Sequence, residues 1–158
     1  MTNLRDRIRM PEEEVRDMIA SSRHLQVASI GPEGRPHLVT MWYAVDEDEL
    51  IAFTTYAKSQ KVKNLERDPR ITVLLEDGAA YDELRGVVIE GEAEVIADDP
   101  ERTARVMALV GAKQSAAPAP DFEAAPPTVS DAATKRCVVR VHPQQVRTWD
   151  HRRLRQSG

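Results

Sequence analysis

The longest regular pattern in this sequence is an alternation of residue types over residues 86–96. Val87, Ile89, Gly91, Ala93 and Val95 alternate with residues that are mostly glutamates. Side chains of a β-strand point alternately to opposite faces of a sheet, so the pattern predicts a strand with one apolar face. The glutamates at positions 90, 92 and 94 are interpreted as the opposite, wet face rather than as catalytic acids.

Five other runs have the composition of β-strands and are bounded by turn-forming residues. They cover residues 24–30, 36–45, 50–55, 70–75 and 136–141. Glycine-proline and acidic turns join the first three, which predicts an antiparallel meander. His142-Pro143 is expected to turn the last strand toward Trp149.

Three helices are expected between these strands. One begins at Pro11 and extends to residue 22, the second covers residues 59–67, and the third starts near Pro100 and ends at Gly111. An Ala/Pro-rich segment at about residues 114–134 is predicted to be a mobile loop. Six or seven strands without a GxGxxG motif or βαβ alternation predict a mainly β, single-domain protein: an antiparallel β-barrel over residues 1–158 with helices at its ends.

Composition excludes several classes of function. A formal net charge of -4 argues against a nucleic-acid binder built on bulk basicity. No run approaches the roughly 20 apolar residues of a membrane span, so we expect a cytoplasmic protein. The single cysteine, Cys137, lies in an apolar run and is expected to be buried. The four histidines are scattered, and no HExxH, CxxC, Walker or Ser-His-Asp pattern occurs, so no metal site is predicted.

One segment has the composition of a phosphate site. Thr54, Thr55 and Ser59 provide hydroxyl donors, and Lys58 and Lys61 provide positive charge. A helix beginning near Ser59 would add free N–H groups and the positive end of its dipole. The alternative is an N-cap serine on a solvated, lysine-rich surface helix. Both interpretations stay open at this point.

Four motifs in order resemble a known superfamily. They are His37-Leu-Val-Thr-Met-Trp-Tyr43, Phe53-Thr-Thr55 with Ser59-Gln-Lys61, the segment at residues 64–70, and Gly86-Val-Val-Ile-Glu-Gly-Glu-Ala93. Together they resemble the pyridoxamine 5'-phosphate oxidase-like (PNPOx-like) split β-barrels that bind FMN. The resemblance is greatest to the flavin/deazaflavin-dependent oxidoreductases of actinobacteria.

The resemblance implies a split-barrel homodimer with a cofactor in each groove between the two chains. The cofactor ring would lie along residues 40–43, and the phosphate would bind near the start of the second helix. Trp149 of the partner chain would close the site. The implied cofactor-binding residues are Thr40, Met41, Trp42, Tyr43, Phe53, Thr54, Thr55, Lys58, Ser59, Lys61 and Trp149. Family members that metabolise vitamin B6 often have arginine where this chain has Gln60, which disfavours FMN oxidase chemistry on pyridoxamine phosphate.

The leading hypothesis is an oxidoreductase that transfers a hydride between coenzyme F-420, a deazaflavin, and an organic acceptor. One alternative is an FMN-dependent oxidoreductase that uses the same groove. Another is a carrier that binds flavin, deazaflavin or haem without turnover. Hydride transfer needs no protein nucleophile, because the cofactor does the chemistry. No catalytic residue is identified: Tyr43, Tyr56 and Tyr81 are weak candidates for a proton donor, and the sequence does not define the substrate.

Overall fold

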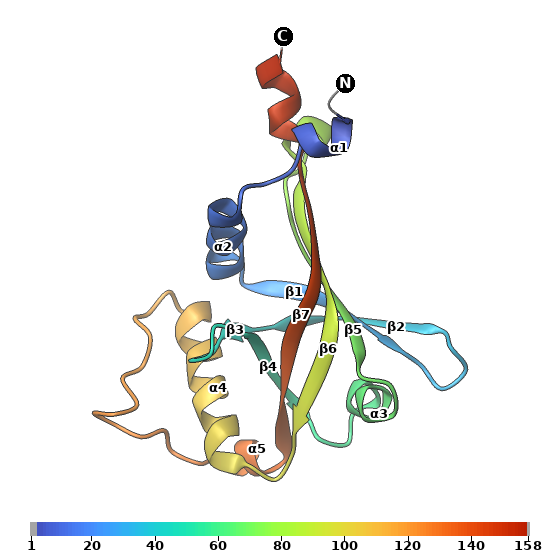
Figure 1. Ribbon diagram of the computed structural model, residues 1–158. Coiled ribbons are helices and arrows are strands. Elements are labelled where there is room, and N and C mark those ends of the chain that lie inside the picture. The colour runs from blue at the N-terminus through green and yellow to red at the C-terminus, as the bar shows by residue number, and fades with distance from the viewer. Residues whose placement is uncertain (1–2, 158) are drawn as a thin grey trace.

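A computed structural model describes residues 3–157, which contain a seven-stranded sheet in the order β2-β1-β5-β6-β7-β4-β3 (Figure 1). All of the paired strands are antiparallel. The strands are β1 (His24–Ile30), β2 (Pro36–Trp42), β3 (Ala44–Val45), β4 (Ile51–Tyr56), β5 (Arg70–Asp77), β6 (Arg85–Ile96) and β7 (Arg136–Asp150). The mainly β, antiparallel prediction is therefore confirmed.

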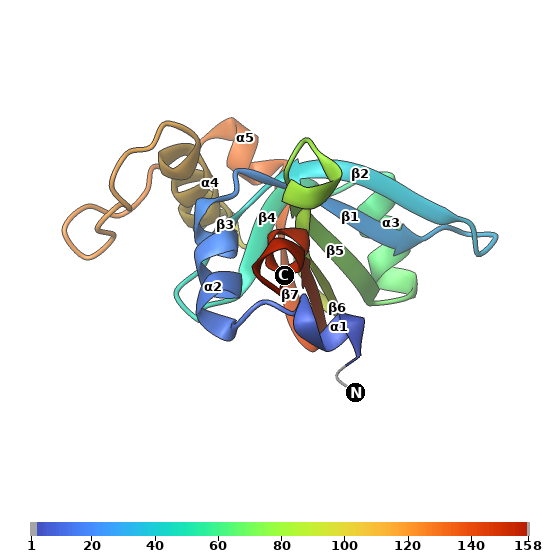
Figure 2. The same ribbon diagram turned by 90° about the horizontal axis from the view of Figure 1, so that it is seen from above.

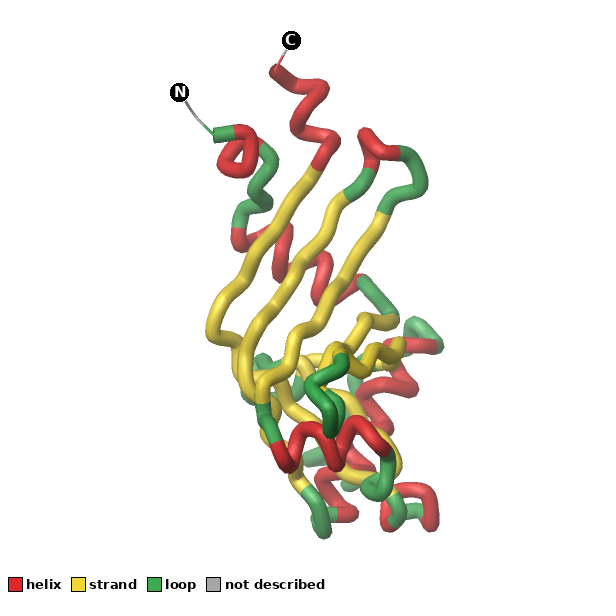
Figure 3. Tube along the Cα trace, turned by 90° about the vertical axis from the view of Figure 1, so that its right-hand side faces the viewer, coloured by secondary structure: helices red, strands yellow, loops and turns green. Residues whose placement is uncertain are grey.

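The sheet curls around one apolar core, which gives the split barrel that the motifs indicated. Seen from above, β1 and β2 lie on one side and β4 on the other (Figure 2). The enclosed core includes Leu25, Phe53, Val73, Val87 and Val139, all of them fully buried. β5, β6 and β7 continue beyond the barrel as a three-stranded arm (Figure 3). Burial of these apolar side chains is the main force that holds the curled sheet together.

The three predicted helices are present, with short helical segments beside them. They are α2 (Glu12–Ser21), α3 (Gln60–Arg67) and α4 (Pro100–Gln114), and the additional segments are α1 (Leu4–Arg7), α5 (Asp131–Thr134), η1 (Tyr81–Glu83) and η2 (His151–Ser157). In residues 3–157, no helix has the length and apolar character needed to cross a membrane.

α4 continues past Gly111, where the sequence predicted its end. Two side chains of its last turn explain the difference. Lys113 Nζ donates a hydrogen bond to the carbonyl of Ile19 at 3.0 Å and lies 3.6 Å from the centre of the Tyr43 ring. Gln114 Nε2 donates to the carbonyl of Arg23 at 2.8 Å. These contacts with the end of α2 and the residues after it stabilise a helical turn that glycine alone would end.

The predicted turn at His142-Pro143 is wrong, because β7 continues to Asp150. The register between β6 and β7 shifts at this point: Pro143 pairs with Gly91, and Gln145 pairs with Glu90. One extra residue on β7 forms a β-bulge, and a bulge accommodates a proline that cannot donate to the ladder. Gly91 is required opposite the bulge, since a Cβ there would lie 2.0 Å from the carbonyl oxygen of His142.

The predicted strand at residues 36–45 divides at Tyr43. β2 pairs with β1, whereas β3 pairs with β4 at the opposite edge of the sheet. Tyr43 is fully buried, and its hydroxyl donates to the carbonyl of Ile19 at 2.5 Å. The two hairpins of the predicted meander therefore exist, but β2 and β4 are not paired. The loop between α4 and α5 covers residues 115–130, which is shorter than predicted because both of its ends are helical.

Candidate functional site

The start of α3 brings together three of the side chains predicted to bind phosphate. Ser59 is the N-cap residue, but its hydroxyl makes no capping hydrogen bond to the helix. It lies 3.5 Å from the Thr55 hydroxyl, which accepts a hydrogen bond from Lys61 Nζ at 2.9 Å. Ser59 therefore occupies the N-cap position, but its hydroxyl does not make the capping hydrogen bond of the alternative interpretation. The first-turn N–H groups of α3 receive no cap from this side chain.

Lys61 is a partly buried cation without an acidic partner. Burial lowers the pKa of its ammonium group, and the nearby charge of Arg136 lowers it further, against an opposing contribution from Cys137. Within residues 3–157, neither Lys61 nor Arg136 forms an ion pair with a carboxylate. Burial raises the pKa of the neighbouring Cys137 thiol, and Glu66 is near enough to raise it further, but Glu66 makes no direct ion pair with either cation. Because buried charges are normally paired, two partly buried cations without a carboxylate in contact suit an anionic ligand.

A cleft of about 260 Å³ opens beside this cluster. Its walls come from β2, β4, α4 and β7, and the lining residues are Thr40, Met41, Trp42, Thr54, Val110 and Arg136. The Trp42 side chain is 61% exposed, so a large apolar surface is available to a planar ligand. Thr54 and Thr55 are adjacent on β4 and point to opposite faces of the sheet. The cleft and the Lys61 cluster therefore lie on opposite faces of β4, both near the end of the strand where α3 begins.

The structure divides the other predicted cofactor-binding residues into three groups. Tyr43 and Phe53 are fully buried, so within one chain they support the cleft wall from behind rather than line it. Lys58 is exposed in the turn before α3. Trp149 lies in a different groove, of about 920 Å³, together with Val15 of α2 and Met10, which lies between α1 and α2.

Trp149 and the cleft lie at opposite ends of β7. Arg136 begins the strand beside Tyr56, whereas Trp149 pairs with Gly86 in the projecting arm (Figure 1). The Trp149 ring packs directly on Gly86, where a Cβ would lie 2.2 Å from ring atom Cζ2. Trp149 therefore does not line the cleft of its own chain.

Two cleft residues, Arg136 and Val110, were not predicted from the sequence. Arg136 was interpreted only as the first residue of a strand. Its guanidinium lies 4.4 Å from the centre of the Tyr56 ring, and its Nε is buried without a hydrogen-bond partner. The pairing of β4 with β7 brings Arg136 to the cleft, and no local sequence signal indicates that long-range contact.

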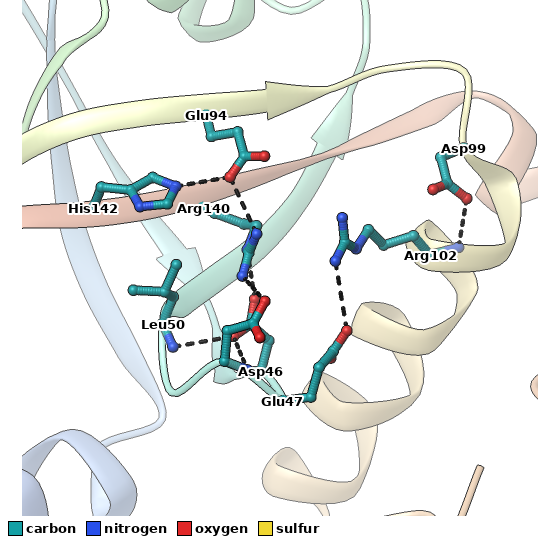
Figure 4. Close-up of polar contacts among 9 residues, drawn as sticks. Asp46, Glu47, Leu50, Glu94, Asp99, Arg102, Arg140 and His142 are labelled. Atoms are coloured by element: carbon teal, nitrogen blue, oxygen red, sulfur yellow. Dashed lines mark hydrogen bonds and ion pairs between the residues drawn. The ribbon is translucent and has the colours of Figure 1, made fainter. Parts of the chain in front are cut away.

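A second charged cluster lies further along β7, around the buried Arg140 (Figure 4). Arg140 Nε donates to Asp46 at 2.7 Å, Nη1 donates to Glu94 at 3.2 Å, and Nη2 binds Asp48. Glu94 also contacts His142 Nε2 at 2.7 Å. Because each guanidinium nitrogen of Arg140 has a carboxylate partner, this cluster joins β6, β7 and the β3–β4 turn and is interpreted as structural.

A curled, seven-stranded antiparallel sheet with a few peripheral helices is the architecture of the split-barrel class of proteins. The chain belongs to the pyridoxamine 5'-phosphate oxidase family, whose model matches residues 11–150. No curated protein matches the chain.

Solved structures extend the comparison. The chain is 44% identical to the conserved hypothetical protein Rv2991 from Mycobacterium tuberculosis, with a TM-score of 0.83 over 97% of this chain and 92% of that one. An F420 reductase is 21% identical, with a TM-score of 0.61 over 82% and 93% of the two chains. An FMN-binding protein related to pyridoxamine 5'-phosphate oxidase, from Nostoc punctiforme, is 19% identical, with a TM-score of 0.64 over 89% and 84%. The last two likenesses show a shared fold.

Proposed function

We propose that the protein is an oxidoreductase that binds a phosphate-bearing flavin-type cofactor in the cleft, and that this cofactor is coenzyme F-420. The observation that carries the proposal is the environment of Lys61, a partly buried cation bonded only to a hydroxyl and close to a second cation. Such a site is stabilised by an anion at the start of a helix. The shared fold with an F420 reductase supports the choice of cofactor.

In this proposal, the chain's residues divide into two functional groups. Thr54, Thr55, Ser59 and Lys61 bind the phosphate, with Lys58 at the solvent side. Thr40, Met41 and Trp42 orient the cofactor ring in the cleft. The bound cofactor supplies the hydride acceptor or donor, while the protein supplies orientation and exclusion of water. The cleft lining contains no carboxylate and no histidine, which suits chemistry performed by the cofactor itself.

We propose further that the working unit is a homodimer. The cleft of one chain, about 260 Å³, is smaller than the roughly 300–1,000 Å³ of typical ligand sites. A second chain would add the missing wall, and the three-stranded arm, whose β7 carries Trp149, projects beyond the barrel (Figure 3). Trp149 of the partner chain would then contact the cofactor ring.

Two alternatives use the same cleft. FMN has a phosphate that the Lys61 cluster could bind, and an FMN-binding relative shares the fold. A carrier that binds flavin, deazaflavin or haem without turnover is favoured by the lack of a proton donor in the cleft lining. Tyr81 does not supply one, because it lies beside His151 with ring centres 4.6 Å apart at the far end of the arm.

Titration of the purified protein with F-420 and with FMN, followed by ligand fluorescence, tests the proposal. We expect micromolar binding of F-420 that weakens in Lys61→Ala and is unchanged in Lys63→Ala. Lys63 is the matched control because it is exposed on the same helix. Preference for FMN would move the protein to the flavin alternative, and binding of neither ligand would overturn the assignment of a cofactor. Turnover with added acceptors would separate an enzyme from a carrier.

A further inference from the structure

We infer that Arg136 is the second cationic ligand of the site and binds the phosphate of the cofactor from the cleft side. The inference rests on the proposed function and extends it to a residue on a different element of the fold. It assigns to β7 the planar, two-donor contact that the residue at position 60 does not supply.

The position of Arg136 follows from the pairing of β4 with β7. Arg136 is opposite Tyr56, the last residue of β4, and the N–H of Ala57 donates to the carbonyl of Lys135 at 3.1 Å. These contacts hold the beginning of β7 against the turn that leads into α3. Arg136 therefore lines the cleft at the same end of β4 as the Lys61 cluster.

The guanidinium of Arg136 is held in place but lacks an acceptor. It stacks on the Tyr56 ring at 4.4 Å, which restricts the plane of its donors. Its Nε is buried and has no hydrogen-bond partner, and no carboxylate pairs with it in the described part of the chain. An oriented guanidinium with unsatisfied donors is suited to bind a phosphate through two parallel hydrogen bonds.

Gln60 is not available for this role. Its side-chain amide donates to Asn64 Oδ1 at 2.8 Å, one turn further along α3. Asn64 is fully buried and donates in turn to the Ser29 hydroxyl at 3.1 Å. The Gln60 amide is thus part of a network that anchors α3 to β1. Arg136 on β7, by contrast, is a planar donor whose Nε has no partner in the described residues.

Arg136→Gln and Arg136→Lys test the inference, with Lys135→Gln as the control on the adjacent exposed residue. Each variant is titrated with FMN and with riboflavin, which has the same ring and no phosphate. We expect Arg136→Gln to weaken FMN binding by about 10- to 100-fold and to leave riboflavin binding unchanged. Arg136→Lys should lie between, since it keeps the charge and loses the two-donor geometry. Circular dichroism and thermal unfolding confirm that each variant is folded.

Two results would overturn the inference: unchanged FMN binding in Arg136→Gln, or an equal loss for FMN and riboflavin. The effect of inorganic pyrophosphate on the melting temperature distinguishes a failure of the Arg136 inference from a failure of the proposed function. If the wild-type protein binds neither FMN nor F-420 but pyrophosphate raises its melting temperature, the cofactor assignment fails. Loss of that shift in Arg136→Gln would then support Arg136 as an anion ligand. If pyrophosphate also has no effect on the wild-type protein, both assignments are wrong.

Discussion

Arg136 and Arg140 lie on the same strand, β7, yet of the two only Arg140 forms ion pairs with carboxylates of the described residues. Arg140 is 6% exposed and contacts the carboxylates of Asp46, Asp48 and Glu94. Arg136 lines an open cleft, and in the described residues no carboxylate pairs with it. Its charge contributes to lowering the pKa of the Lys61 ammonium group.

The difference separates a structural charge from one that is available for binding. Asp46 also accepts hydrogen bonds from the N–H groups of Asp48 and Leu50, each at 3.0 Å, so Arg140 closes the β3–β4 turn onto β7 (Figure 4). Removing this arginine would leave the buried Asp46 carboxylate without its ion-pair partner. In the described part of the chain, Arg136 pairs with no carboxylate and its Nε has no hydrogen-bond partner, and we propose that its donors bind a ligand. Proteins retain unfavourable arrangements of this kind mainly at functional sites.

The largest effect should come from Arg140→Met. We expect the free energy of unfolding to fall by about 3–5 kcal/mol, because the buried Asp46 carboxylate loses its partner. Urea denaturation measures the change. Arg147→Met on the same strand is the control: Arg147 pairs with Glu90 at 2.5 Å, but both side chains are largely exposed. That exposed pair should contribute less than about 1 kcal/mol. Equal effects of the two variants would show that the Arg140 cluster does not hold the turn.

Arg136→Met should change stability only when ligand is present. At a concentration of FMN or F-420 about 100 times its Kd, the wild-type protein should gain about 2.7 kcal/mol of stability. If the Kd of Arg136→Met is roughly 30-fold weaker, the same ligand concentration should raise its free energy of unfolding by less than about 1 kcal/mol. Without ligand, we expect its free energy of unfolding to stay within about 0.5 kcal/mol of wild type. A large loss without ligand would make Arg136 a structural residue like Arg140.

The sequence predicted those parts of the fold and the candidate site that depend on local pattern. Alternation over residues 86–96 predicted β6, and the hydroxyl and lysine residues around Ser59 predicted the cluster at the start of α3. Adjacent residues on a strand face opposite sides, but the pattern did not show which side is the core. For that reason Trp42 at the cleft and Tyr43 in the core were placed together.

Long-range pairing was the part that the sequence did not reveal. Tyr56 and Arg136 are neighbours only because β4 pairs with the first half of β7. In the sequence, β5, β6 and α4 separate these two strands. The bulge opposite Gly91 likewise depends on the register of two strands, so Pro143 gave a misleading turn signal. The local pattern thus identified one half of the candidate anion site, and tertiary structure was needed for the other half.

The smallest effect is a difference in acid stability between the two arginine sites. The hydrogen bond from His142, with the charge of Arg140, holds the pKa of the Glu94 carboxyl below its usual range. A carboxyl whose pKa is lower in the folded state stabilises the fold above its unfolded pKa of about 4.3, and this contribution is lost as the pH falls through the folded value.

Urea unfolding between about pH 6 and pH 3 should therefore show a smaller acid-induced loss of stability in Glu94→Gln than in wild type. Arg136→Met should keep the wild-type slope, since no carboxylate of residues 3–157 forms an ion pair with Arg136. A wild-type slope in Glu94→Gln would contradict the coupling within the Arg140 cluster. A reduced slope in Arg136→Met would show that the two sites share a carboxylate, and the contrast between a compensated and an uncompensated arginine would no longer hold.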